Sequence, residues 1–317
     1  MEQTVVGISE FGGPEVLRLM TAPTPRVLPG DILVRVHAAG INPVDWKTRA
    51  GAPTPAAAAL GKSPYILGWD VSGVVEEVGK GVHLFREGDE VFGMPWFPRP
   101  AGAYAQFVAA PASHFALKPR SLDHVHAAAI PLAGLTALQA LTEAADVRPG
   151  DRVLVQAAAG GVGHLAVQLA KHIGAHVIGT ARARHHEWLR SLGADELVDY
   201  SAVQFEEVVA DVDLVIDLVG STAVRSLSVL RRGGVLVRVA PGSPLELLEQ
   251  AAQRGVRVSP EILVAPDGPG LRRLAGLVDE GKLSVEVEKT FPLTEAAAAH
   301  RLGEENHVAG KLVLRVG

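Results

Sequence analysis

The chain has 317 residues, of which 48% are hydrophobic and 21% charged, a balance typical of a folded protein long enough for two domains. The net charge of −5 and the absence of a Lys/Arg-rich block argue against a nucleic-acid partner. The chain has no cysteine, which excludes disulfides, thiolate nucleophiles and cysteine-ligated zinc. We find no signal peptide and no apolar stretch of membrane-spanning length, so we expect a cytoplasmic protein without membrane insertion.

The first 120 residues predict short strands separated by Gly and Pro turns, a pattern typical of a small barrel or sandwich. The expected strands are Asp31–His37, Gly68–Val78, Asp89–Phe92 and Ala103–Ala109. The Ala-rich segment Pro55–Leu60 is predicted to be a loop.

From about Ser121, helix-period segments take over and then alternate with strands. The expected strands are Arg152–Gln156, Ala175–Thr180, Glu196–Asp199, Val212–Asp217, Val235–Val239 and Val256–Ile262. Helices are expected to begin near Val162, Arg184, Val203, Thr222 and Leu245. Apolar strands joined by crossover helices predict a doubly wound parallel sheet, so the fold class is α/β. After Pro266 the expected order is a helix, a strand, a helix and a strand, the last three being Ser284–Phe291, Thr294–Gly303 and Lys311–Val316.

A turn rich in small residues lies between the first strand of this sheet and its helix. Ala157, Gly160 and Gly163 have the spacing of the dinucleotide-binding fingerprint, with Ala in the first glycine position. Glycines there let the backbone approach a pyrophosphate, and the helix N-terminus favours negative charge. The predicted cofactor-binding residues of this turn are Ala158, Gly160, Gly161, Val162 and Gly163. The alternative is a purely structural turn.

The end of the second strand indicates which cofactor is bound. An NAD-binding fold usually has an acidic residue there, for the ribose 2′-hydroxyl. This chain has Thr180, Arg182 and Arg184 instead, and its first acidic residue is Glu187. Arginines can bind a 2′-phosphate through charge-assisted hydrogen bonds, which predicts NADPH as the cofactor. The alternative is a solvated basic start to the next helix.

Several segments in this order resemble the zinc-independent quinone oxidoreductase branch of the medium-chain dehydrogenase/reductase family. They are the turn at Ala157–Gly163 together with Ala38–Asp45, Leu67–Gly73, Leu132–Ala137 and Gly193–Asp195. The resemblance implies a GroES-like β-barrel catalytic domain in residues 1–121, completed by residues 266–317. It also implies a Rossmann NADP-binding domain in residues 122–265, an active site in the cleft between the two, and a homodimer.

The resemblance also implies chemistry without a metal. Zinc-dependent relatives have a Cys and a His-Glu pair where this chain has Asn42 and Trp69-Asp70. We therefore expect no metal site, and we expect hydride transfer to an electrophilic carbon in a quinone or an α,β-unsaturated carbonyl compound. The alternatives are an enoyl-thioester reductase and a non-catalytic NADPH-binding sensor.

The resemblance places part of the remaining site, namely Asn42, Thr136, Tyr200, Gly310 and Lys311. Position along the chain suggests Tyr65, which precedes the Trp69 strand, and Val219 and Ala240, which follow strands at their carboxyl ends. The catalytic candidates are Asn42, Asp45, Tyr65 and Thr136, of which Asn42 and Thr136 also lie near the nicotinamide and its ribose. Further cofactor contacts are expected at Tyr200, Val219, Ala240, Gly310 and Lys311. Each candidate also has an ordinary structural interpretation: Asn42 as a turn residue before a proline, Asp45 as a helix cap, Tyr65 and Thr136 as packing residues, and Lys311 as a surface residue.

Overall fold

The computed structural model describes residues 1–240 and 246–317. The chain forms two compact units, one made of residues 1–135 with 265–317 and the other of residues 136–264. The predicted division into functional domains, residues 1–121 with 266–317 and residues 122–265, remains a prediction. Within the described residues, no helix is long and apolar enough to cross a bilayer.

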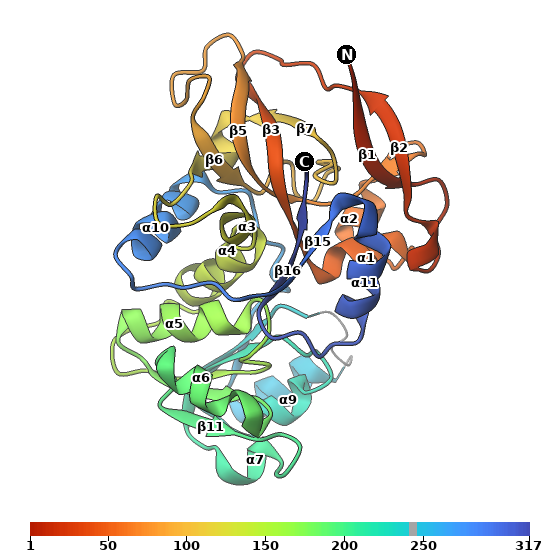
Figure 1. Ribbon diagram of the computed structural model, residues 1–317. Coiled ribbons are helices and arrows are strands. Elements are labelled where there is room, and N and C mark those ends of the chain that lie inside the picture. The colour runs from red at the N-terminus through yellow and green to blue at the C-terminus, as the bar shows by residue number, and fades with distance from the viewer. Residues whose placement is uncertain (241–245) are drawn as a thin grey trace. The chain divides into compact units, whose positions relative to one another are not determined.

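The first unit is built mainly from antiparallel strands (Figure 1). Its strands are β1 (Glu2–Ile8), β2 (Arg18–Pro23), β3 (Asp31–Ile41), β4 (Tyr65–Ile66), β5 (Asp70–Val78), β6 (Glu90–Gly93), β7 (Phe107–Pro111), β8 (Phe115–Leu117), β15 (Val287–Pro292) and β16 (Lys311–Arg315). One sheet has the order β2-β1-β4, and the other has the order β15-β16-β3-β5-β6-β8, with β7 also paired to β3. The strands predicted over Asp31–His37, Gly68–Val78 and Asp89–Phe92 are confirmed. The strand predicted over Ala103–Ala109 is displaced, because β7 begins at Phe107.

The pairing of β3 with β5 and β16 determines where Asn42, Asp70 and Lys311 lie in this unit. β16 pairs antiparallel with β3, which places Leu312 opposite Ile41. β3 in turn pairs with β5, which places Gly40 opposite Asp70. The end of β3 therefore meets the start of β5 and the start of β16, although residues 42, 70 and 311 are far apart in the sequence.

Helices cover parts of this unit. They are α1 (Pro43–Arg49), α2 (Pro55–Ala58), α3 (His124–Ala128), α10 (Gly268–Asp279) and α11 (Ala296–Glu304), while α4 (Pro131–Gln139) crosses the division between the units. Figure 1 shows α1, α2 and α11 gathered together. The loop predicted over Pro55–Leu60 is wrong for its first part, because Thr54 caps α2 by accepting a hydrogen bond from the Ala57 N–H at 3.0 Å.

The second unit contains a six-stranded parallel sheet. Its strands are β9 (Arg152–Val155), β10 (His176–Thr180), β11 (Glu196–Val198), β12 (Val212–Asp217), β13 (Leu230–Arg238) and β14 (Arg257–Val258). Their order is β11-β10-β9-β12-β13-β14, and every pair is parallel. This is the doubly wound order expected for a dinucleotide-binding fold, so the predicted α/β class is confirmed.

Most elements of this second unit lie close to the predicted ones, but β13 begins at Leu230, well before the predicted strand Val235–Val239. The helices are α5 (Gly163–Ile173), α6 (His186–Ser191), α7 (Phe205–Val208), α8 (Ala223–Ser226) and α9 (Leu247–Arg254). The predicted helix start at Leu245 lies outside the described residues. The sixth strand is much shorter than the predicted Val256–Ile262, because Pro260 has no N–H for a regular ladder.

Candidate active site

Asn42 lies at the junction between β3 and α1, in an extended conformation that Pro43 favours. Its side-chain Nδ2 donates to Asp70 Oδ2 at 2.8 Å. Its Oδ1 accepts from the Lys311 ammonium, which also donates to Ile41 O at 2.8 Å. Both ends of the amide are therefore bonded to charged groups of opposite sign, which determines its orientation. The Asn42 side chain is buried and bonded at both ends, so its interpretation as only a turn residue before Pro43 is incomplete.

Asp70 and Lys311 place a buried pair of opposite charges around this amide. The Lys311 Nζ lies 3.8 Å from Asp70 Oδ2, and Asp70 Oδ1 accepts from the Leu132 N–H at 2.8 Å. Burial raises the pKa of Asp70 to about 6, although Lys311 and Asn42 act in the opposite direction. Burial lowers the pKa of Lys311, and Asp70 and Asp45 oppose that shift. Lys311 is only 4% exposed, so its interpretation as a surface residue is wrong.

Gly310 precedes this lysine and holds a backbone conformation that favours glycine. Its φ is +75°, and an added Cβ would lie 2.5 Å from Glu286 O. The positive φ of Gly310 lets the chain turn into β16, which pairs with β3 and brings Lys311 to the end of β3.

Asp45 lies one helical turn beyond Asn42. Its Oδ2 accepts from the Asn42 backbone N–H at 2.6 Å, so it both caps the helix and holds Asn42. The two interpretations of Asp45, orienting Asn42 or capping the turn, thus describe one hydrogen bond. Burial raises the pKa of Asp45 to about 7, and the nearby Asp70 adds to that shift.

Of the other two catalytic candidates, Tyr65 makes no hydrogen bond to the cluster of Asn42, Asp45, Asp70 and Lys311 among the described residues, and Thr136 belongs to the second unit. Tyr65 is in β4, where its ring stacks on Phe11 with centroids 5.8 Å apart. Thr136 is buried in α4, one turn beyond Leu132. The structure also buries Tyr104, whose hydroxyl lies 3.0 Å from His300 Nε2. The pKa of Tyr104 is raised well above its ordinary value, chiefly by burial and then by the negative charge of Asp45. Sequence reasoning missed Tyr104, because no local motif there indicates a polar site.

The turn after β9 in the second unit has the shape expected for a phosphate-binding loop. Ala157 has a φ of +47°, and the Gly160 N–H donates to Ala157 O at 2.9 Å. A Cβ on Gly163 would lie 2.3 Å from Ala157 O and 2.8 Å from Ala158 Cα, so only glycine fits at the start of α5. The backbone N–H groups of Gly161 and Val162 make no hydrogen bond to the described residues. The residues present therefore fit a bound pyrophosphate.

Two side chains fix this turn in place. The Thr180 hydroxyl accepts from the Ala157 N–H at 3.1 Å, while Thr180 O accepts from the Ala158 N–H at 2.9 Å. The fully buried His164 contacts Gly160 O through its Nδ1 at 2.9 Å, and its ring stacks near Trp188. Sequence reasoning missed His164, although its position directly after Gly163 was the available signal.

The basic segment after β10 has the two predicted arginines on a short 3₁₀ turn, Ala183–His185. Within the described part of the chain, neither Arg182 nor Arg184 forms an ion pair, and the Arg184 Nε donates to His185 Nε2 at 3.0 Å. Asp199, at the end of the neighbouring strand, accepts from the Ala183 N–H. Hydrogen bonds from Ser201 hold the pKa of Asp199 below its ordinary value. Tyr200, which follows it, is 52% exposed.

Asp217 organises the loop after β12, where Val219 was predicted. Its Oδ1 accepts from the N–H groups of Val219 at 3.0 Å and Gly220 at 2.9 Å, and its backbone oxygen accepts from the Ala240 N–H. Val219 and Ala240 therefore both lie at carboxyl ends of strands, where ligands bind in such sheets. Sequence reasoning missed Asp217, which it took only as the last residue of a strand.

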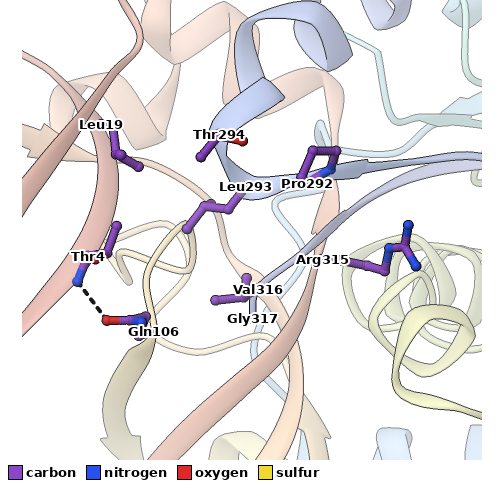
Figure 2. Close-up of a pocket in the computed structure, with 9 residues that line it drawn as sticks. All are labelled: Thr4, Leu19, Gln106, Pro292, Leu293, Thr294, Arg315, Val316 and Gly317. Atoms are coloured by element: carbon purple, nitrogen blue, oxygen red, sulfur yellow. Dashed lines mark hydrogen bonds between the residues drawn. The ribbon is translucent and has the colours of Figure 1, made fainter.

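A surface pocket of about 380 Å³ lies elsewhere on the first unit (Figure 2). Its walls include Leu19, Leu293 and Arg315, and on one side the Thr4 N–H donates to Gln106 Oε1 at 2.8 Å. None of its lining residues was predicted for the site, and none belongs to the Asn42 cluster.

Comparisons with known proteins agree with a fold that combines a mainly antiparallel unit with a parallel nucleotide-binding sheet. Residues 28–120 match the family model of the alcohol dehydrogenase GroES-like domain, and residues 192–314 match that of zinc-binding dehydrogenases. A solved quinone oxidoreductase from Coxiella burnetii is 41% identical, with a TM-score of 0.94 and complete coverage of both chains.

Two relatives that are named as reductases or oxidoreductases align with most of the chain. A 2-haloacrylate reductase from a Burkholderia species is 37% identical over 90% of this chain and 91% of its own. An NADPH-dependent alkenal/one oxidoreductase from Arabidopsis thaliana chloroplasts is 34% identical over 96% of this chain and 78% of its own.

The chain therefore belongs to the medium-chain dehydrogenase/reductase family. Within it, the chain is an oxidoreductase of the quinone oxidoreductase branch, which uses a nicotinamide cofactor. The GroES-like assignment of the first unit is confirmed.

Zinc does not fit the residues at the metal-ligand positions implied by the family. Trp69 is no metal ligand, since its indole N–H donates to Arg99 O at 2.7 Å. The Asn42 oxygen already accepts from an ammonium group. A divalent cation there would have to displace that ammonium, so these residues do not fit a metal centre.

Proposed function

We propose that this enzyme transfers a hydride from NADPH to a quinone or an α,β-unsaturated carbonyl acceptor without a metal. The observation that carries this proposal is the Asn42 amide, held by Asp70 and Lys311 at the end of β3. NADPH supplies the hydride when it is bound, and the protein supplies orientation and a hydrogen-bond donor.

The donor assigned to the acceptor is the second N–H of the Asn42 amide. The Nδ2 group has two hydrogens and makes a single hydrogen bond among the described residues, to Asp70. Because Lys311 holds the amide oxygen, the amide cannot flip without leaving two charged groups unpaired. An oriented donor of this kind stabilises the negative charge that develops on a conjugated oxygen after hydride addition.

NADPH is favoured over NADH by charge. Arg182 and Arg184 lie just beyond the end of β10, and neither is neutralised by a carboxylate of the described chain. The turn from Ala158 to Gly163 would receive the pyrophosphate, and the arginines the 2′-phosphate.

The acceptor class follows from what these groups can do. An amide donor polarises an oxygen more weakly than a metal does, so the carbon that receives the hydride must already be electrophilic. The 2-haloacrylate reductase and the alkenal/one oxidoreductase have names that describe such conjugated acceptors, which supports the same class here.

The test of cofactor choice compares dissociation constants for NADPH and NADH in the wild type and in Arg184→Ala. We expect the variant to lose about tenfold in NADPH affinity, about 1.4 kcal/mol, with no change for NADH. Equal wild-type affinities for the two cofactors would contradict the proposal. Arg190→Ala, a change at an exposed arginine of α6, is the matched control.

The test of acceptor class measures NADPH oxidation with p-benzoquinone, methyl vinyl ketone and crotonyl-CoA. Turnover of the first two with little on the third supports the proposal. A preference for the thioester would instead identify an enoyl-thioester reductase, and binding without oxidation would identify a sensor.

We also propose that the enzyme is a cytoplasmic homodimer. The dimer would form along the β14 edge of the sheet, since no further strand covers β14 among the described residues.

A further inference from the structure

One backbone oxygen of the phosphate-binding turn is held by two donors of the same residue. Gly160 O accepts from the His164 backbone N–H at 3.1 Å and from His164 Nδ1 at 2.9 Å. The first bond is the ordinary helical one at the start of α5, whereas the second comes from a fully buried side chain. A carbonyl oxygen can only accept, so the Nδ1 of His164 carries a proton.

The position of the Gly160 oxygen determines the direction of the next N–H group. The peptide bond between Gly160 and Gly161 is trans and planar, so its C=O and its N–H point in opposite directions. The oxygen points toward α5 and His164, and the Gly161 N–H therefore points away from the helix. That N–H makes no hydrogen bond to the described residues, so it is available to a pyrophosphate.

A step between two glycines needs such a constraint. Gly160 and Gly161 have no Cβ, so their backbone could adopt many conformations in which the Gly161 N–H points elsewhere. The helical bond alone holds the oxygen at the frayed first turn of α5, and the imidazole adds a second bond from the interior of the unit. His164 therefore reduces the freedom of the peptide before any ligand binds.

A neighbouring aromatic ring determines the orientation of the imidazole. Trp188 in α6 stacks on His164, with ring centroids 5.9 Å apart and an interplanar angle of 30°. His185 contacts Trp188 edge to face, with centroids 6.3 Å apart, and accepts from the Arg184 Nε at 3.0 Å. These contacts connect the phosphate-binding turn to the basic segment within one unit of the fold.

We propose that His164 is a positioning residue for the coenzyme, whose imidazole N–H holds the Gly160–Gly161 peptide with its N–H directed at the pyrophosphate. The inference rests on the binding of a dinucleotide at residues 158–163 proposed above. NADPH and NADH share the pyrophosphate, so removal of the imidazole N–H weakens both by the same factor. Arg184→Ala, in contrast, weakens NADPH alone.

The test compares two substitutions of nearly equal shape. His164→Asn places an amide N–H at the position of Nδ1, whereas His164→Leu has the same branching and no donor. We expect the Kd values for NADPH and NADH to be about fivefold higher in His164→Leu than in His164→Asn, with the same ratio for both coenzymes. His172→Leu, at an exposed histidine of α5, is the control and should change neither Kd. Equal Kd values in His164→Asn and His164→Leu would overturn the proposal, because they would mean that His164 only fills space.

A spectroscopic readout uses the wild type and does not depend on how a variant folds. Long-range ¹H–¹⁵N correlations in the labelled protein without coenzyme show which ring nitrogen of His164 carries a proton. We expect a proton on Nδ1 that exchanges slowly with solvent, since it is buried and bonded to Gly160 O. A ring protonated on Nε2 alone would overturn the proposal.

These outcomes are distinct from those that test the proposed function. A wild type that binds both coenzymes but never oxidises NADPH would defeat the proposed reaction and leave the contrast between His164→Asn and His164→Leu intact. Active wild-type enzyme whose two His164 variants have equal Kd values would defeat the inference alone.

Discussion

The buried imidazole of His300 should make the stability of the enzyme depend on pH in a way that one substitution removes. The pKa of His300 is lowered from 6.5 to about 3 in the folded state, chiefly by burial and then by Arg49. Unfolded chains therefore bind a proton between these two values that folded chains do not bind. Stability from the neutral ring is complete above pH 6.5 and decreases as the pH falls toward 3.

The magnitude follows from the size of the pH interval. Each unit below 6.5 costs about 1.4 kcal/mol, so at pH 5 the wild type should lose about 2 kcal/mol of unfolding free energy through His300. His300→Gln cannot take up the proton. The stability difference between wild type and variant should thus shrink by about 2 kcal/mol between pH 7 and pH 5.

Urea unfolding at pH 7 and pH 5, followed by circular dichroism, measures this difference. Contributions from Asp45 and Asp70 are present in both proteins and cancel in the comparison. His83→Gln, at an exposed site, should show no such pH dependence. A gap between wild type and His300→Gln that is the same at both pH values would refute the reasoning, because it would mean that the folded protein protonates His300 freely.

Three further predictions concern the cofactor turn, the β16 junction and assembly. Gly163→Ala should weaken NADPH binding at least tenfold, because the added Cβ would lie 2.3 Å from a backbone oxygen. Gly276→Ala, where an added Cβ would meet open space, should leave NADPH binding unchanged, and calorimetric titration measures both affinities. Gly310→Ala should lower the unfolding free energy by about 1–3 kcal/mol in urea titrations, owing to its positive φ and its close contact with Glu286. Light scattering should give twice the mass of one chain, and Val258→Pro on the β14 edge should reduce it; an unchanged mass would argue against assembly there.

Patterns that repeat locally along the chain were enough to predict the parallel sheet. Four of its six strands were located closely, since buried strands such as Val212–Asp217 are apolar and the turn at Gly160–Gly163 has a fixed spacing. The first hairpin, β1 with β2, was not predicted, because β2 is largely exposed and its apolar residues form no buried face.

The candidate site was less predictable, because long-range register creates it. Asn42 and Asp45 belong to one local motif, but Asp70 and Lys311 join them only through the pairing of β3 with β5 and β16. Tyr104 and His300 lie 196 positions apart, and nothing near either residue indicates a polar partner. The tyrosine chosen from sequence, Tyr65, is closer along the chain to Trp69 and Asp70 yet lies in another sheet.

The most direct test of hydride transfer to a conjugated acceptor follows the hydride itself. NADPH carrying deuterium on either face of C4 is incubated with the enzyme and methyl vinyl ketone, and the product is analysed by mass spectrometry and NMR. We predict that one of the two labelled cofactors delivers deuterium to the β-carbon, at a rate that Asn42→Ala strongly reduces. A reduced product without deuterium from either cofactor, or full activity in Asn42→Ala, would contradict the account.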